Sequence, residues 1–158
     1  MEPGIEKEPR GVFTLDHIGI QVADLDAAIQ LFATMFGYVQ ATAAVHNTRQ
    51  SVRVVFLEKD GSLPLKLFQK VDAEGAPMAT RGGAATLHHL AFRTGDMSAT
   101  LQQMERAGAR ILVPPQPGEA FENEPIAFVH IGMGINTELI ATGKRAARLQ
   151  PTVQEPQP

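Results

Sequence analysis

Cysteine and tryptophan are absent from this chain of 158 residues, and tyrosine occurs only once. Without cysteine there is no disulfide and no thiolate nucleophile, so a bound metal would need imidazole, carboxylate, amide or water ligands. An excess of positive charge is missing too: the net charge is -3. This balance argues against a nucleic-acid partner and against binding to an anionic membrane surface.

Long hydrophobic runs are also missing. No apolar run approaches the ~20 residues that a membrane-spanning helix needs, and the acidic N-terminus lacks the features of a signal peptide. We therefore expect a cytoplasmic protein with no membrane partner. A length of 158 residues and a hydrophobic content of 44% suit one domain with a substantial core.

Both ends of the chain are rich in proline and charge and poor in large apolar side chains. Such segments bury too little surface to offset the entropy of ordering them. The sequence therefore predicts a disordered tail at residues 1–12, a single domain at residues 13–142 and a Pro-rich tail at residues 143–158.

An internal repeat organises the domain. The segment LDHIGIQVADLDAAIQLF (residues 15–32) matches LHHLAFRTGDMSATLQQM (residues 87–104), 72 positions later, and the match pairs His17 with His89. Such a repeat indicates a duplicated structural unit.

The same offset continues through the second part of each copy. VVFLEKDGSLPLKLF (residues 54–68) overlays IAFVHIGMGINTELI (residues 126–140), which pairs Phe56 with Phe128 and Lys66 with Glu138.

Within each copy the hydrophobic period changes once. Residues 15–22 alternate as a strand with one buried face, Asp24 then caps a helix with an apolar stripe, and Gly37 ends that helix. The second copy repeats this pattern with Asp96 as the cap and Gly108 at the end.

Three short strand candidates follow each helix: residues 38–45, 51–57 and 63–68, then residues 110–113, 126–130 and 137–141. We expect Gly- or Pro-rich loops at residues 81–87 and 114–125. The predicted class is α+β, with two βαβββ modules, residues 13–70 and 86–142, that form a cupped mixed sheet and are joined by a loop at residues 71–85.

Strand alternation connects this fold to a site. If Ile18, Ile20 and their counterparts pack under the helices, His17 and His89 must project from the opposite, concave face. Lys66 and Glu138 occupy equivalent positions in the last strand of each module. A pseudo-twofold axis would bring these four polar side chains to a common centre.

The pieces LDHIGIQVADLDAAIQLF, LHHLAF and NTELIA resemble the vicinal oxygen chelate superfamily, whose members include glyoxalase I, methylmalonyl-CoA epimerase, extradiol dioxygenases and fosfomycin-resistance enzymes. The resemblance covers about residues 13–142. It is nearest to the epimerase, because GAATLHHLAF, GARIL and IAFVHIGMGINTELI are similar to the second module of that family. It signals the superfamily more strongly than one reaction, since this fold hosts many chemistries.

In epimerase and glyoxalase relatives, four side chains hold a divalent metal ion at the positions of His17, Lys66, His89 and Glu138. Lys66 departs from the pattern, because a protonated amine has no lone pair to donate. The resemblance therefore implies a three-ligand site, His17, His89 and Glu138, for a divalent ion such as Zn, Co, Mn, Ni or Fe. Gln69, the nearest amide, should point to the other face of the sheet.

Lys66 has several roles open to it. Beside a cation its pKa should fall, so it could act as a base, as a proton donor or as a positive group for an anionic substrate oxygen. The alternative is a vestigial site, in which the Lys66 ammonium pairs with Glu138 and replaces the metal. We take Glu138 and Lys66 as the catalytic candidates and Arg93 and Gln21 as candidate substrate-binding residues.

Other histidines are expected to have plainer roles. His88 should point to the helix side or to an edge, and His46 should be solvated. Val54 stands near the place where some epimerase relatives carry an additional Glu, so one of the two bases of an epimerase has no obvious counterpart in this sequence.

The expected function is a metal-dependent isomerase or lyase of the epimerase type, acting on a small acyl or hydroxy-carbonyl substrate. Two alternatives stay open: an Fe(II) dioxygenase that uses the same triad, and a non-catalytic small-molecule-binding protein of the resistance type. An edge-to-edge homodimer is compatible with such an open cup.

Overall fold

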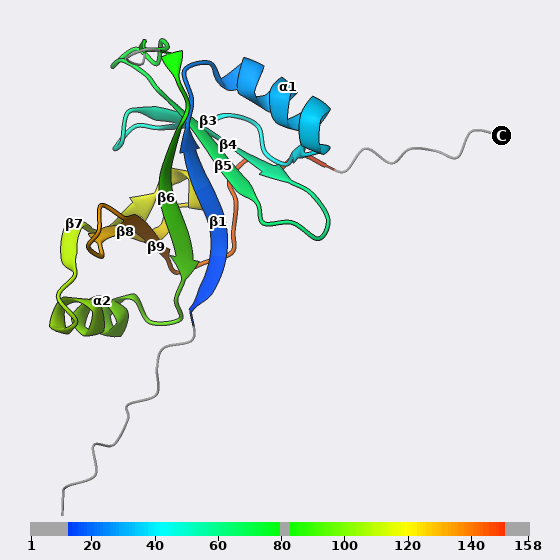
Figure 1. Cartoon of the computed structure of the whole chain (residues 1–158). Helices are drawn as coiled ribbons and strands as arrows, with labels where there is room; N and C mark the ends of the chain where they lie inside the picture. Colours follow the sequence, from blue (N-terminus) through cyan, green and yellow to red (C-terminus); the bar gives the residue numbers. More distant parts are fainter. Residues whose placement is uncertain (1–12, 80–82, 151–158) are drawn as a thin grey trace, which may run out of the picture.

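The computed structural model describes residues 13–79 and 83–150, and these form one curved sheet with a helix near each end (Figure 1). Within these residues the sheet has nine strands in the order β2-β4-β5-β1-β6-β9-β8-β7, with β3 paired to β4. The predicted α+β class and cupped mixed sheet are confirmed. No helix among these residues has the length and apolar character needed to cross a membrane.

The first module comprises β1 (Thr14–Gln21), α1 (Leu25–Phe36), β2 (Val39–Gln40), β3 (Val45–Asn47), β4 (Val52–Glu58) and β5 (Leu65–Lys70). The second comprises β6 (Thr86–Arg93), α2 (Met97–Arg106), β7 (Arg110–Gly118), the short 3₁₀ helix η2 (Glu119–Phe121), β8 (Glu124–His130) and β9 (Asn136–Ile140). β1 and β6 pair antiparallel at the centre, and each pairs parallel with the last strand of its own module. The two modules are thus related by a pseudo-twofold axis between β1 and β6.

Helix capping follows the sequence pattern. Asp24 accepts a hydrogen bond of 2.9 Å from the backbone N–H of Ala27, and Asp96 accepts an equivalent bond of 2.9 Å from Ala99. Gly37 ends α1 with φ +71°, a left-handed conformation that glycine adopts at low cost.

Two predicted elements are wrong in detail. The single strand expected at residues 38–45 is divided into β2 and β3, because Thr42 turns its hydroxyl to the N–H of Phe56 and pairs with Arg148. The loop expected at residues 114–125 is largely strand, since β7 continues to Gly118. β7 is an edge strand with irregular register, where prolines without an N–H are tolerated.

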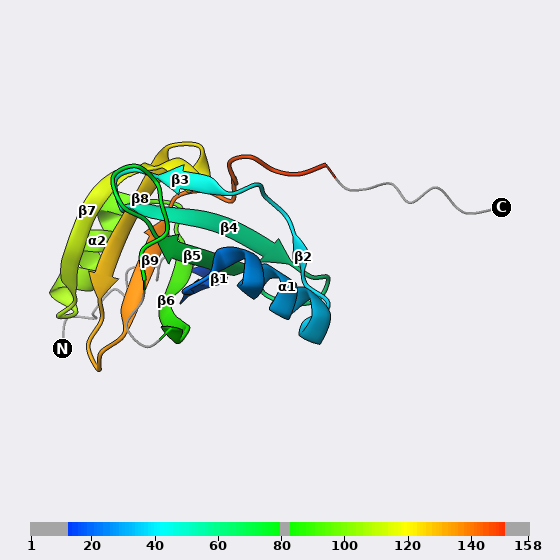
Figure 2. The same ribbon diagram turned by 90° about the horizontal axis from the view of Figure 1, so that it is seen from above.

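The convex face of the sheet is covered by the two helices, as Figure 2 shows from above. Each helix packs on a separate cluster. Leu25 of α1 packs with Ile20, Val22, Val55, Leu57, Leu65 and Leu67, and Leu101 of α2 packs with Ala127, Val129 and Leu139. The strand alternation therefore leaves the other face of β1, β4, β5, β6, β8 and β9 to build the interior of the cup.

The segment after β9 also belongs to the folded part. A tail is the wrong prediction for residues 143–150, because Leu149 donates a backbone hydrogen bond to Ala41 and Arg145 is 5% exposed. The rest of the predicted tails, residues 1–12 and 151–158, lies outside the described residues.

Candidate functional site

Each central strand contains one extra residue. The register of β1 against β6 skips Asp16 on one strand and His88 on the other, positions that correspond in the repeat. A β-bulge changes the alternation, so neighbouring residues can serve the same face. Asp16 therefore contacts His17, and His88 lines the cavity with His89. The prediction that His88 points to the helix side or an edge is wrong for this reason.

The predicted centre forms around Glu138. Its Oε2 lies 3.0 Å from Nε2 of His17 and 3.1 Å from Nε2 of His89. The donor atoms of these three buried residues all lie within 4.8 Å of one another. β1, β6 and β9 supply one residue each, so three adjacent strands set the spacing.

Lys66 joins this centre from β5. Its Nζ donates hydrogen bonds of 2.8 and 3.0 Å to Oε1 and Oε2 of Glu138. Glu138 is fully buried and Lys66 is 2% exposed. Burial would raise the pKa of Glu138, but the charge of Lys66 and contacts with the two histidines lower it well below its ordinary value. Glu138 is thus a carboxylate at neutral pH.

His17 is held at its other nitrogen by Asp16. Nδ1 of His17 lies 2.7 Å from Oδ2 of Asp16, and because a carboxylate accepts, Nδ1 is the donor. Asp16 also receives hydrogen bonds from Arg93 and Arg145. Burial alone would raise the pKa of Asp16, but these partners lower it below its usual range. The carboxylate fixes the ring, so that Nε2 lies at hydrogen-bond distance, 3.0 Å, from Oε2 of Glu138.

His89 has a different neighbour. Its Nδ1 lies 2.9 Å from Nδ1 of His88, so one ring donates to the other. Burial lowers the pKa of His89 to about 4, against the opposing effect of Glu138. Despite its 3.1 Å approach to Glu138, Nε2 of His89 is buried and makes no hydrogen bond of acceptable geometry. A neutral imidazole with an unpartnered inward nitrogen suits a metal ligand.

This donor set fits a divalent cation. Two imidazole Nε2 atoms and one ionised carboxylate face one point, and the opposite nitrogen of each ring is already hydrogen-bonded. Two histidines with one carboxylate form a facial triad that leaves further positions open. Lys66, which stands at the position where the resemblance implies a fourth ligand, contacts Glu138 from β5.

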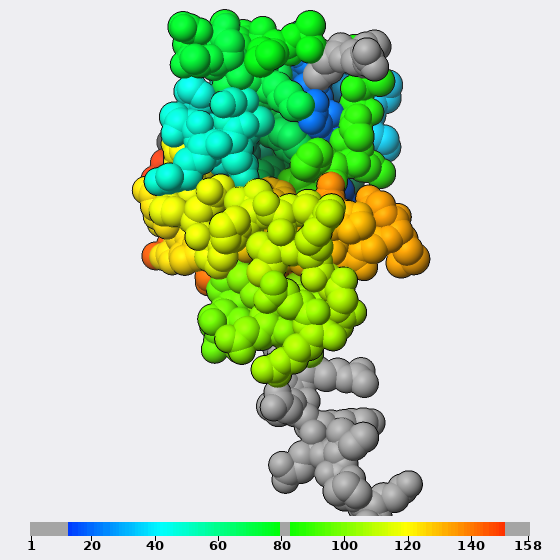
Figure 3. Space-filling model, turned by 90° about the vertical axis from the view of Figure 1, so that its left-hand side faces the viewer, coloured from blue at the N-terminus to red at the C-terminus, as the bar shows by residue number. Residues whose placement is uncertain are grey.

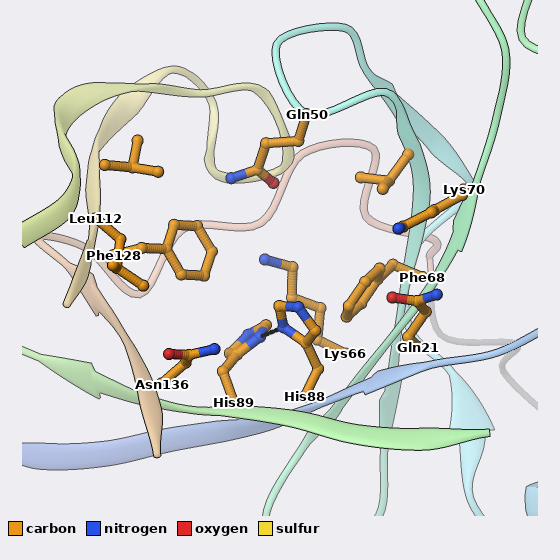
Figure 4. A pocket seen from close by; sticks show the side chains of 12 residues that line it. Gln21, Gln50, Lys66, Phe68, Lys70, His88, His89, Leu112, Phe128 and Asn136 are labelled. Atoms are coloured by element: carbon orange, nitrogen blue, oxygen red, sulfur yellow. Dashed lines mark hydrogen bonds between the residues drawn. The ribbon is translucent and has the colours of Figure 1, made fainter. Parts of the chain in front are cut away.

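A cavity of about 390 Å³ opens in front of His89 and Lys66 (Figure 4). It is lined by Gln21, Gln50, Val52, Lys66, Phe68, Lys70, His88, His89, Leu112, Val113, Phe128 and Asn136. Figure 3 shows the hollow on this face, between the cyan and green surface of the first module and the yellow surface of the second. No carboxylate lines it among the described residues, so its polar part is amide and basic.

Gly19 makes room for one of these rings. Gly19 pairs with His89 across the two central strands, and a Cβ on Gly19 would lie 2.2–2.5 Å from atoms of the His89 ring. Real Cβ atoms do not approach so closely. The glycine is therefore required by the position of His89 rather than by a turn.

The two candidate substrate-binding residues, Gln21 and Arg93, lie in different surroundings. Gln21 lines the cavity, whereas Arg93, its counterpart in the repeat, is not among the lining residues and hydrogen-bonds Asp16 at 2.5 Å. The role of Arg93 towards a substrate stays a prediction. Gln69 caps α1 through Leu25 and Ala23, so it points away from the centre as predicted. His46 is exposed, as expected.

Three residues of the site were not predicted from the sequence: Asp16, Phe121 and Arg145. Asp16 had a signal, since it stands beside His17 and breaks the polar alternation of its strand. Phe121 and Arg145 had none, because only the folded chain brings η2 and the C-terminal segment against β1 and β4.

Comparison with known proteins places this geometry in a family. The family model described as the Glyoxalase/Bleomycin resistance protein/Dioxygenase superfamily matches residues 16–128. The chain belongs to this superfamily, which agrees with the two modules and the His/His/Glu centre.

The similar proteins include several epimerases. An ethylmalonyl-CoA/methylmalonyl-CoA epimerase of Cereibacter sphaeroides is 27% identical over 119 residues, covering 73% of this chain and 87% of that protein. Methylmalonyl-CoA epimerase of Mycobacterium tuberculosis is 30% identical, with a TM-score of 0.67, over 80% of this chain and 86% of that one. A Streptomyces coelicolor methylmalonyl-CoA epimerase variant in complex with 2-nitronate-propionyl-CoA is 26% identical, with a TM-score of 0.60, over 81% and 96%.

Proposed function

We propose that this protein is a metal-dependent isomerase of the epimerase type that moves a proton next to the carbonyl group of a small acyl substrate. The observation that supports this most directly is the convergence of His17, His89 and Glu138 at the inner end of a cavity, with Nε2 of His89 buried and without a hydrogen bond. Several epimerases of CoA esters are similar to the chain.

His17, His89 and Glu138 would hold the ion. A divalent ion at that point would withdraw charge from the substrate carbonyl and so make the neighbouring C–H group more acidic. The metal is Zn, Co, Mn, Ni or Fe, in keeping with two imidazoles and one carboxylate.

Lys66 and Glu138 would act as one proton-transfer unit. Lys66 lines the cavity. Glu138 lies behind Lys66, and both of its carboxylate oxygens accept hydrogen bonds from Nζ. In its neutral amine form, Nζ of Lys66 has a lone pair; it takes the proton from the carbon next to the carbonyl and becomes an ammonium that hydrogen-bonds the Glu138 carboxylate. The electron pair of that C–H bond then moves towards the carbonyl oxygen as an enolate.

Epimerisation needs a proton donor on the other side of the carbon. Val54 is buried in the concave core, so it supplies no such group. His88 lines the cavity, and burial followed by the charge of Lys66 lowers its pKa. We assign the second proton transfer to His88: in its protonated form it would deliver its own proton to the opposite face of the carbon while Lys66 keeps the proton that it took, and proton exchange with water would then restore both side chains.

The cavity favours an anionic substrate. Its polar lining combines Lys66, Lys70 and the two histidines with the amides of Gln21, Gln50 and Asn136, while Val52, Phe68 and Phe128 provide apolar surface. A carboxylated acyl group carried by a thioester, as in the substrates named for the similar epimerases, meets both requirements. Gln21 is the proposed substrate-positioning residue on β1.

A second candidate is a metal-free binding protein. The supporting observation is that the Lys66 ammonium already hydrogen-bonds both oxygens of Glu138. In that case the ammonium supplies the positive charge that an ion would otherwise supply, and the cavity binds a small anion without turnover.

Metal affinity separates the two candidates. We expect the wild type to bind Zn²⁺ or Co²⁺ with one ion per chain, His17→Ala to weaken binding by more than about 100-fold, and Lys66→Glu to bind at least as tightly as the wild type. Lys59→Glu, at an exposed lysine that contacts the backbone of Phe36, is the matched charge control. A tag-free wild type that binds no divalent ion under any loading condition would favour the metal-free protein.

Proton exchange tests the chemistry itself. With methylmalonyl-CoA in D₂O, the metal-loaded wild type should exchange the hydrogen on the carbon next to the carbonyl for deuterium. Lys66→Met should lose this exchange while retaining substrate binding. His88→Asn should slow epimerisation more than exchange, because one proton transfer would remain. Exchange at the uncatalysed rate for every metal and thioester tested would contradict the proposal.

A further inference from the structure

Arg145 lies in the C-terminal segment and reaches back into the cup. Its side chain is 3% exposed, and its guanidinium carbon lies 4.3 Å from the centroid of the Phe56 ring and 5.2 Å from that of Phe121. Its Nη2 donates to Oδ2 of Asp16, the same oxygen that receives the hydrogen bond from Nδ1 of His17.

The repeat shows what this position corresponds to. Asp16 is the counterpart of His88, and Phe56 is the counterpart of Phe128. His88 and Phe128 line the open cavity. Arg145 therefore fills, on the His17 side of the pseudo-twofold axis, the space that corresponds to the substrate cavity on the His89 side.

We propose that Arg145 is a positioning residue that closes this second half of the cup and holds the Asp16 carboxylate on Nδ1 of His17, which fixes Nε2 of His17 towards Glu138. The role of Arg145 in ring placement stands on the geometry. Its consequence for metal binding and turnover rests on the proposed function.

The chemistry of the pair supports this role. A buried carboxylate needs a partner, and the planar guanidinium gives Asp16 a permanently charged donor at a fixed angle while its flat faces pack on aromatic rings. Arg93, the other cation on Asp16, has a side chain that is 46% exposed. Arg145 is thus the partner that is shielded from water and donates to Oδ2 of Asp16, the oxygen that also accepts from His17.

The test compares Arg145→Ala, Arg145→Lys and the control Arg148→Ala. Arg148 lies three residues further on the same segment and pairs with Glu58 at the surface. Imidazole ¹⁵N shifts of His17, recorded without metal or substrate, should report a single Nδ1-protonated, hydrogen-bonded state in the wild type and in Arg148→Ala. Arg145→Ala should shift these resonances towards a mixture of states.

Zn²⁺ affinity provides the second readout. We expect Arg145→Ala to weaken Zn²⁺ binding by about 10-fold, at the lower end of the 10–100-fold loss typical when a partner of a metal ligand is removed. Low-millimolar guanidinium should restore both the affinity and the His17 shifts, because the ion fits the space between Asp16 and the Phe56 ring. Arg148→Ala should change neither.

Unchanged His17 shifts in folded Arg145→Ala would overturn the proposal, and so would equal changes in Arg148→Ala. If Arg145→Ala does not fold, Arg145→Lys provides the test, because lysine keeps the positive charge but lacks the planar guanidinium with its paired N–H donors. Wild-type His17 shifts in that variant would also overturn the proposal. The ¹⁵N measurement needs no turnover, so a missing epimerase activity would leave this conclusion standing.

Discussion

On the His89 side of the cup, His88 and Phe128 border an open cavity, whereas on the His17 side their counterparts Asp16 and Phe56 are covered by Arg145. The central strands of the two sides share a bulge at equivalent positions of β1 and β6. The difference lies in what covers each side: β7 and Gln50 border the cavity, while η2 and the C-terminal segment close the other half.

This difference shows how a duplicated fold acquires one site rather than two. Two equivalent histidines remain at the centre, but only His89 borders the cavity, while His17 is fully buried. The cavity is therefore bordered by Lys66 on one side of the centre, with the buried Glu138 behind it. Variants at equivalent positions measure this asymmetry directly.

The largest difference is expected at the equivalent aromatic residues of β4 and β8. Phe56 is 1% exposed and packs against His17, Phe121 and Arg145, so Phe56→Ala should cost about 3–5 kcal/mol of unfolding free energy. Phe128 is 9% exposed and borders the cavity, so Phe128→Ala should cost about 2 kcal/mol. Urea unfolding of both variants gives the two values; equal losses would contradict the view that only one side is closed.

A smaller effect is expected at Gly19 and its counterpart Ala91. Gly19→Ala places a methyl group where the His89 ring lies, so it should cost about 1–3 kcal/mol and displace the imidazole resonances of His89. Ala91→Gly on the other strand should cost about 1 kcal/mol and leave the His17 resonances in place. A folded Gly19→Ala variant with wild-type His89 shifts would show that the close packing of this ring is not required.

The smallest effect should be the same on both sides. Asp24 and Asp96 cap the two helices with equivalent bonds of 2.9 Å, far from the cavity. Asp24→Ala and Asp96→Ala should each cost about 1 kcal/mol, without any change in Zn²⁺ affinity. Thermal unfolding with calorimetry checks the pair, and a clear difference between the two would place part of the asymmetry in the helices.

Much of the centre was predictable because strand alternation survives duplication. The pattern around His17 assigned it to the face opposite Ile18 and Ile20, and the repeat carried the same assignment to His89 and paired Lys66 with Glu138 in the last strand of each module. The contact between Lys66 and Glu138 agrees with equivalent positions meeting across a pseudo-twofold axis.

The bulges were not predictable in the same way. Alternation assumes one residue per step; Asp16 breaks the polar alternation of its strand, but the sequence does not show that the partner strand skips Asp16 and His88. The same limit applies to the Pro-rich β7, where an edge position in the sheet overrides the usual reluctance of proline to join a strand.

The amino-acid sequence by itself determined the duplicated module, the faces of its strands, the helix caps and the identity of the converging side chains, because these depend on periodicity and on short-range hydrogen bonds. Only the tertiary structure decided which half of the cup stays open. Arg145 and Phe121 reach the His17 side from segments distant in the chain. The hydrophobic periodicity of the strands that they cover does not show which distant segment packs there.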